Sequence, residues 1–454
     1  MTPAIVADAR ALGGAQPWFE TQLEHESVPD SEATAMRSWF GYLDSTPKDL
    51  VTPSASGYAV TADLASWTIL QRTYSRRQLF ECMVEFWSNL LHVPLVDGSA
   101  WPFRSQYDGV IRQHALGRFD EMLPAVTVHP AMGLYLDNAF STKERVNENL
   151  GRELLELHSV GVGTGYTEEE VLDSARILTG WQVDRTESFS SYYAEDDHWT
   201  GSVSVLGFQD DNASADGRDL TARYLRYLAY HPLTARRIAK RLCVRFVADD
   251  PSDSIIDAVA SAYLDSDTDV TTTLRALQNH SDFADSAGAK IRTPGEDAVA
   301  CYRALGARAW GTSSDSDFTR AVTSQHELLG VVPFGWHSPA GFPDEGAAWN
   351  SVGRMLGSLY LHQAMANRWM EPEGVVYPTL VERLPELPAS VETIVDHVSR
   401  EVLQVAANAQ LQRAAAKVLA LPAQREIQTA GDFGESRMIQ LLATMLNSPA
   451  HMKR

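Results

Sequence analysis

Cysteines, basic residues and long apolar segments are all scarce in this sequence. Its 454 residues include three cysteines, Cys82, Cys243 and Cys301, which lie far apart and fit no C-x-x-C spacing. Neither a disulfide framework nor a cysteine zinc site is indicated, so we expect reduced thiols. No apolar run approaches the roughly 20 residues that cross a bilayer. The start, MTPAIVADARALGG, also lacks a basic region followed by a long apolar one. As written, the sequence predicts a soluble, cytoplasmic protein without a transmembrane segment, and export only if the true N-terminus lies upstream.

Basic residues are outnumbered by acidic ones. The chain has 38 lysines and arginines against 59 aspartates and glutamates, and its formal net charge is -21. Nucleic-acid binding relies on a basic surface that contacts phosphates, so this balance argues against it. No nucleophile elbow, Walker loop, dinucleotide fingerprint or His-Glu-x-x-His sequence is present either. The composition and motifs therefore exclude the most readily recognised enzyme classes.

Helix-forming patterns fill most of the chain, and 44% of its residues are hydrophobic, which is enough for a large core. Alternating residues after Trp181 predict a small β-hairpin insertion near 182–208. We expect a mainly α, multi-helical globular fold. Three segments are predicted: an N-terminal helical segment at 1–70, a helical core with the central motif at 71–370, and a C-terminal helical segment at 371–454 packed on that core.

The stretch from Asn147 to Trp181 is the strongest local signal. It contains two helical runs, a glycine-rich turn and a closing Thr-Gly-Trp, and Thr167 with Glu170 predicts a capping box. In the first run, glutamates and one arginine recur at i+4, which is typical of a salt-bridge ladder on a solvated face. If packing encloses that face, its charges become candidates for acid–base work. The catalytic candidates are Glu148, Arg152 and Glu153.

Three arginines repeat at i+4 in a helix predicted from Pro232 to about Val247. Arg237, Arg241 and Arg245 lie beside an apolar face, an unusual arrangement in an acidic protein. The row could hold a phosphate, sulfate or carboxylate through forked hydrogen bonds. The alternative, which the sequence favours, is pairing with acidic neighbours such as Glu148 or Glu156. These arginines are the predicted anion-binding candidates.

Three histidines, His129, His231 and His280, each follow an apolar helical run. No ligand spacing links them, so turn or capping roles are favoured and no metal site is predicted. The cofactor stays unknown. The glycine-, proline- and aromatic-rich segment from Gly330 to Asn350 is long enough to form a pocket wall, or it is a rigid packed loop.

These motifs together resemble those of the bacterial domain-of-unknown-function family eighteen hundred, over nearly the whole chain. The resemblance rests on YLDNA, NEN with RELLELH-x-x-G, YTEEEV-x-x-x-AR and TGW. It extends through QLFECMVEFW, HPLTARRIAKRLCVRFVADDP, the GW-containing loop and SPAHM. It implies a soluble, predominantly helical protein, often exported in relatives and encoded beside a sulfatase-like partner. It supplies no established catalytic residues.

The chain departs from this resemblance in three places. Phe86-Trp87-Ser88-Asn89-Leu90 stands where members often have Phe-Trp-His-Asn-His, which weakens any metal or acid–base role of those histidines. An opening helix of the His-Leu-Leu-Arg-Arg type is missing before ADARALGG, which indicates a late start or a lost helix. Val203 and Ser204 stand where a lysine is common.

Dense helical patterns without a catalytic signature favour a helical binding or scaffold protein. Its partner would be an envelope-associated or secreted protein, and its interaction surface would be the Gly330 to Asn350 segment with the central turn. The alternative is an enzyme acting on an anionic ester or glycan, with Arg237, Arg241 and Arg152 holding charge. Glu148 or Glu153 would then be the acid or base.

Overall fold

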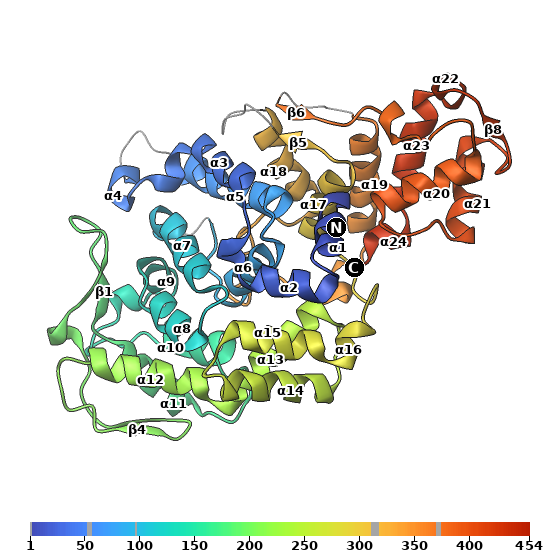
Figure 1. Ribbon diagram of the computed structural model, residues 1–454. Coiled ribbons are helices and arrows are strands. Elements are labelled where there is room, and N and C mark those ends of the chain that lie inside the picture. Colours follow the sequence, from blue (N-terminus) through green and yellow to red (C-terminus); the bar gives the residue numbers. More distant parts are fainter. Residues whose placement is uncertain (1, 52–56, 96–97, 310–316, 369–373) are drawn as a thin grey trace.

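The computed structural model of the chain describes residues 2–51, 57–95, 98–309, 317–368 and 374–454. Helices dominate these residues, and only short antiparallel strand pairs interrupt them (Figure 1). The predicted mainly α fold is confirmed. None of the helices within these ranges is both long and apolar enough to cross a membrane.

The first helices of the chain lead to one long, largely buried helix. Their bounds are α1 (Pro3–Ala11), α2 (Ala15–Leu23), α3 (Ser31–Met36), α4 (Pro47–Leu50) and α5 (Gly57–Tyr74). Most residues of α5 are buried, because this helix packs against α3 and α18 (Asp317–Leu329). The N-terminal segment thereby shares its core with elements from the far end of the chain.

Helices from the middle of the chain form the lower half of the molecule in Figure 1. These are α6 (Gln78–Leu90), α7 (Arg104–His114), α8 (Phe119–Thr127), α9 (Pro130–Tyr135), α10 (Asn149–Glu153), α11 (Glu168–Leu178), α12 (Arg218–Tyr230), α13 (Pro232–Phe246), α14 (Asp253–Asp265), α15 (Val270–Asn279) and α16 (Ser281–Ala284). Their apolar faces meet in one continuous core, in which Trp87, Phe119 and Leu154 are buried.

The remaining helices form the other half and carry the red C-terminal end in Figure 1. They are α17 (Pro294–Ala304), α18, α19 (Val352–Ala366), α20 (Val391–Val402), α21 (Ala409–Leu419), α22 (Ala430–Phe433), α23 (Glu435–Leu446) and α24 (Pro449–Met452). A second core joins them to α5 and contains Trp67, Phe318 and Leu441. The two cores therefore do not follow the order of the chain. The three predicted segments stay a prediction.

The insertion after Trp181 forms two hairpins. Strand β1 (Trp181–Val183) pairs with β2 (Ser191–Tyr193), and β3 (Val203–Val205) pairs with β4 (Phe208–Asp210). Val203 and Val205 are buried while Ser204 between them is exposed, as the predicted alternation requires. Two further strand pairs are β5 (Arg308–Ala309) with β6 (Val375–Val376) and β7 (Ala389–Ser390) with β8 (Glu426–Ile427).

The central stretch folds into α10, a π-helical turn at Leu154–His158, and α11. The predicted capping box is present, because Thr167 Oγ1 accepts from the amide of Glu170 and the Glu170 carboxylate accepts from the amide of Thr167. Helices α10 and α11 approach closely at Gly151, where the hydroxyl of Ser174 donates to the Gly151 carbonyl at 3.1 Å. The stretch is therefore a pair of packed helices joined by a glycine-rich turn.

Candidate functional site

The predicted arginine row lies along α13, the helix that begins at Pro232 after the side chain of His231 caps it. The structure surrounds its three arginines differently. Arg245 is 2% exposed, Arg241 keeps 22% of its side-chain surface, and Arg237 is half-buried. Arg245 is therefore the one fully buried member of the row.

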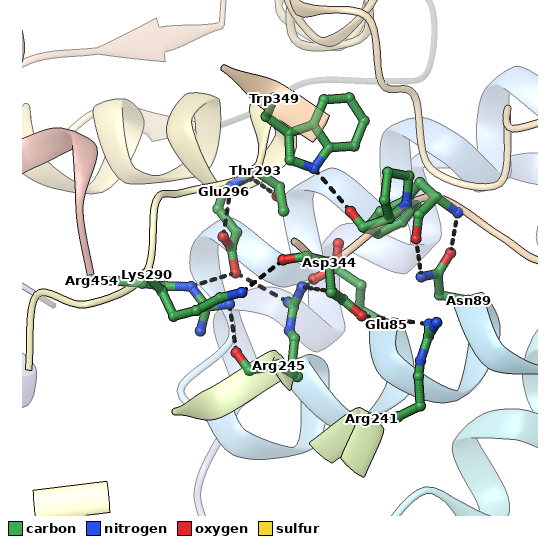
Figure 2. A network of polar contacts seen from close by, with 12 residues as sticks. Glu85, Asn89, Arg241, Arg245, Lys290, Thr293, Glu296, Asp344, Trp349 and Arg454 are labelled. Atoms are coloured by element: carbon green, nitrogen blue, oxygen red, sulfur yellow. Dashed lines mark hydrogen bonds and ion pairs between the residues drawn. The ribbon is translucent and has the colours of Figure 1, made fainter. Parts of the chain in front are cut away.

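Arg245 is the centre of a buried charge cluster (Figure 2). Its Nη1 lies 3.0 Å from Asp344 Oδ1, and its Nη2 lies 2.5 Å from Glu85 Oε2 and 3.2 Å from Glu296 Oε1. Burial by itself would lower the pKa of Arg245, but the three carboxylates outweigh burial and raise it well above its ordinary value. The carboxylates come from α6, α17 and the 330–350 loop, so the cluster joins the two halves of the molecule.

Three more arginines share these carboxylates. Arg72 lies 2.8 Å from Glu85, Arg454 lies 3.1 Å from Glu296, and Arg241 lies 3.5 Å from Asp344. Within the described ranges, four guanidinium groups thus contact three carboxylates in one connected network. The network is cationic by one charge, although the protein as a whole is strongly acidic.

A cavity of about 180 Å³ lies against this network. Its charged wall consists mainly of arginines, with three glutamates and the thiol of Cys82 between them. The arginines are Arg72, Arg245, Arg292, Arg303 and Arg454. A small concave site with convergent cationic donors is the usual form of an oxyanion-binding site.

Arg292 and Arg303 differ from the other arginines of the cavity, because neither forms an ion pair in the part of the chain that the structure describes. Arg303 Nη1 donates to the carbonyl oxygens of Arg72 at 3.3 Å and Thr73 at 3.2 Å, and Arg292 Nε donates to that of His451 at 2.7 Å. Burial lowers the pKa of Arg303 to about 10 and also lowers that of Arg292. A bound anion would supply an ion-pair partner that neither group has among the described residues.

The first two arginines of the predicted row lie outside the cavity. Arg237 Nη2 donates to the carbonyl of Leu157 at 2.9 Å, beside the π-helical turn, and Arg237 has no ion-pair partner among the described residues. Burial, and then the charge of Arg241, lower the pKa of Arg237 to about 10. The Nε atoms of both arginines are buried without a hydrogen-bond partner in the described ranges. Of the predicted anion-binding residues, the structure places only Arg245 on the cavity wall.

The acidic partners that the sequence suggested for this row are engaged elsewhere. Glu148 and Glu156 pair with Arg152 at 3.1 and 3.6 Å, and Glu168 joins them at 2.6 Å, so the predicted ladder forms on the surface. Expecting the row to pair with Glu148 or Glu156 was therefore wrong, because the carboxylates that reach the row come from distant segments of the chain.

Glu153, the remaining catalytic candidate, is half-buried. Burial, and then the nearby charge of Glu156, raise the pKa of the Glu153 carboxyl. None of Glu148, Arg152 and Glu153 lines the arginine cavity. Their catalytic role stays a prediction.

The 330–350 loop is fastened to the body of the protein. Asn89 Nδ2 donates to the carbonyl of Phe342 and Asn89 Oδ1 accepts from its amide, both at 2.7 Å (Figure 2). His92 Nε2 lies 2.7 Å from the carbonyl of Trp336, and Asp344 contacts Arg245. Of the two interpretations given to this segment, the structure favours the rigid packed loop, and the loop also supplies one carboxylate to the cluster.

The predicted helix-capping role of three histidines is confirmed. The Nδ1 atoms of His129, His231 and His280 accept from backbone amides two residues later, at 3.1, 3.2 and 3.2 Å. Each ring thereby satisfies one free amide at the start of a helix.

Sequence reasoning missed most of the cavity wall. One available signal was Glu85, which stands with Glu81 at i+4 in an otherwise apolar helix, because buried carboxylates need cationic partners. Arg292 and Arg303 carry no such local signal. The sequence also gave no indication of a second group that the structure assembles, Asp297 with Cys301, His362 and His451.

A family model described as "Protein of unknown function (DUF1800)" matches residues 1–453. This confirms the resemblance drawn from the motifs, over nearly the full length. No curated protein and no solved structure matches the chain.

Proposed function

We propose, from the premise that the chain belongs to the DUF1800 family of proteins of unknown function, that it is a binding protein that holds an anionic group in its arginine-lined cavity. The observation that carries this proposal is the pair Arg292 and Arg303. Both line the cavity, and both have backbone carbonyls but no carboxylate as partners in the described ranges. Partly buried guanidinium groups without an ion-pair partner are costly, so an anion that enters the cavity gains their attraction.

The chemistry of the wall favours a single small oxyanion. Planar guanidinium groups donate in a fork that fits carboxylate, sulfate and phosphate oxygens. Glu81, Glu85 and Glu296 also face the cavity, and they would repel a ligand carrying several negative charges. The expected ligand is inorganic phosphate or sulfate. It could equally be a larger molecule that carries one phosphate, sulfate or carboxylate group.

Calorimetric titration with phosphate, sulfate and acetate tests the proposal. We expect at least one of these anions to bind, and Arg303→Gln and Arg292→Gln to weaken its binding about tenfold or more, because a hydrogen bond to a charged group contributes about 1.5–3 kcal/mol. Arg236→Gln is the matched control, since Arg236 lies on the surface of α13 and pairs with Asp253 and Asp257. The Arg236→Gln variant should bind the anion with the same affinity as the wild type. Equal affinities in all three variants, or no binding of any of the anions, would contradict the proposal.

A second candidate function is docking of a protein partner, and one observation favours it. Helix α19 follows the 330–350 loop directly and exposes five apolar side chains at helical spacing. Their exposed fractions are 77% for Val352, 42% for Met355, 60% for Leu356, 37% for Leu359 and 49% for Tyr360. A contiguous apolar stripe on the outside of a helix is typical of a protein-binding surface. The family resemblance implies a sulfatase-like protein as the partner.

Co-purification from the native host tests this docking function. The wild-type chain should recover one stoichiometric partner, and Leu356→Glu should lose it because a charge cannot be buried in an apolar interface. Val418→Glu is the control, because Val418 is a similarly exposed apolar residue on α21. Recovery of the wild-type chain alone, or equal recovery by both variants, would rule the stripe out as the contact.

A further inference from the structure

Four potential metal ligands lie together near the arginine cavity, since Asp297 and Cys301 directly follow the lining residues Glu296 and Ala300 on α17. Asp297 and Cys301 face the same side of α17 at i+4, His362 comes from α19, and His451 comes from α24. Each of the four residues is at most 3% exposed, and one ligand atom from each lies within 4.8 Å of all the others. The group is thus fully enclosed, unlike the cavity beside it.

Three separations within the group are close to those around a tetrahedral ion. Asp297 Oδ1 lies 3.0 Å from His362 Nε2 and 3.2 Å from His451 Nε2, and His451 Nε2 lies 3.4 Å from Cys301 Sγ. Zinc bonds of roughly 2.0 Å to nitrogen or oxygen and 2.3 Å to sulfur place tetrahedral ligand atoms roughly 3.3–3.5 Å apart. Small shifts of the side chains would bring all four ligand atoms around one ion, because every pair lies within 4.8 Å.

Both ring nitrogens of His362 have a polar partner. Nδ1 lies 2.8 Å from Asn447 Oδ1, and Nε2 lies 3.0 Å from Asp297 Oδ1. With Nδ1–H donated to Asn447, Nε2 would carry the lone pair that a metal ion needs. A second partner that fixes the outer nitrogen is the usual arrangement around a metal-binding histidine.

The arrangement does not suit a cysteine nucleophile. In a Cys–His–Asp relay, one ring nitrogen contacts the thiol and the other contacts the carboxylate. In this group the same nitrogen, His451 Nε2, faces both Cys301 Sγ and Asp297 Oδ1. The full burial of Cys301 also prevents a substrate from reaching the thiol.

We propose that Asp297 Oδ1, Cys301 Sγ, His362 Nε2 and His451 Nε2 bind one Zn²⁺ in a closed, structural site. A thiolate with two imidazoles favours zinc over magnesium or calcium, which prefer oxygen ligands. On binding, the Cys301 thiol releases its proton to solvent and the thiolate coordinates the ion. The site does not depend on the proposed anion binding.

Polar residues around the ligands hold them in place. The second oxygen of the Asp297 carboxylate accepts from Ser358 Oγ at 2.7 Å and from Arg354 Nη2 at 3.3 Å. Asn447 contacts the His362 ring, and Arg292 donates a hydrogen bond to the backbone carbonyl of His451. Three of the four ligand residues are therefore held by polar contacts outside the group. The ion would join α24 to α17 and α19, elements that are distant in the sequence.

Metal analysis of an untagged, full-length chain purified without chelator tests the site. We expect about one Zn²⁺ per chain, as a closed four-ligand site requires. Cys301→Ser and His362→Gln should lose it, while Cys243→Ser, which alters a buried cysteine outside the group, should keep it. After the zinc is removed, Co²⁺ added to the wild type should give a thiolate-to-cobalt charge-transfer band and the visible bands of a tetrahedral ion. The charge-transfer band should be missing in Cys301→Ser.

A variant that keeps all four ligands tests the site even if the substitution of a ligand prevents folding. Asn447→Ala should lower zinc affinity about 10- to 100-fold, the usual effect of removing a residue that orients a metal ligand. If Cys301→Ser fails to fold, this shift in the zinc titration decides the question. The proposal is overturned if the wild type carries no stoichiometric metal and takes up neither Zn²⁺ nor Co²⁺. It is equally overturned if the variants bind zinc as the wild type does.

Discussion

A single buried arginine, Arg245, holds three carboxylates that belong to different parts of the chain. Glu85, Glu296 and Asp344 each lie within hydrogen-bonding reach of its guanidinium, and its exposed fraction is 2%. Buried charges of this kind add little net stability as a set, but removal of one member leaves its partners buried with too little counter-charge. The loss of Arg245 should therefore cost more stability than its ion pairs contribute in the intact protein.

Arg245→Met should lower the free energy of unfolding by about 3–5 kcal/mol, because three buried carboxylates would lose the one cation that they share and keep only one arginine each. Arg236→Met, on the exposed face of the same helix, should lower it by no more than about 1 kcal/mol. Urea denaturation of both variants measures the difference. Similar losses in the two variants would show that the Arg245 cluster is not the buried junction described above.

At the scale of elements, the crossing of α10 and α11 depends on one glycine. A Cβ at Gly151 would lie 2.6 Å from the amide nitrogen and 2.8 Å from the Cα of Ala175, both backbone atoms of α11. Backbone cannot move aside as a side chain can, so the two helices would have to separate. The glycine in NENLGRELLELH is thus required by close packing between helices.

Gly151→Ala should destabilise the protein by about 1–3 kcal/mol, the usual cost of overpacking a tight contact. Gly109→Ala on α7 is the matched control, because Gly109 is exposed and a Cβ there meets nothing within 4 Å. That change should stabilise the protein by about 0.5–1 kcal/mol, because alanine favours a helix over glycine. Thermal or urea unfolding should therefore give opposite signs, and equal signs would refute the packing argument.

At the scale of the whole molecule, several buried histidines make the fold sensitive to acid. Burial is the main cause that lowers their pKa values, to about 4 for His92, about 3 for His129, about 3 for His158 and about 4 for His326. In the unfolded chain these side chains titrate near 6.5. Between these values the unfolded state binds protons that the folded state excludes, so stability falls as the pH falls from about 6.5 towards 4.

The free energy of unfolding, measured by urea denaturation across this pH range, should therefore decrease with falling pH, at a slope of up to about one proton for each of these histidines. His326→Gln should reduce the slope by about one proton, because its ring then no longer titrates in the unfolded state alone. A slope that His326→Gln does not alter would mean that His326 is protonated in the folded protein.

Local patterns in the sequence sufficed for the helical fold and for the details encoded within a few residues. The helix over 232–246, the Thr167 and Glu170 capping box and the three histidine caps were all predicted, because each depends on hydrogen bonds between residues at most four apart. The family assignment came from the same continuous motifs. The hairpin insertion was also predicted, although its division into two hairpins was not.

Only the tertiary structure decided which charges meet. Arg245 was a predicted anion-binding residue, yet its partners Glu85 and Asp344 lie 160 and 99 residues away, and Cys301 lies 150 residues from His451. Spacing along the chain says nothing about such pairs, because helices from both halves of the molecule must pack before their polar faces come together. The sequence by itself therefore determined the helices, their caps and the family. Packing determined the arginine cavity and the four-ligand group, because both form from residues that only the folded chain brings together.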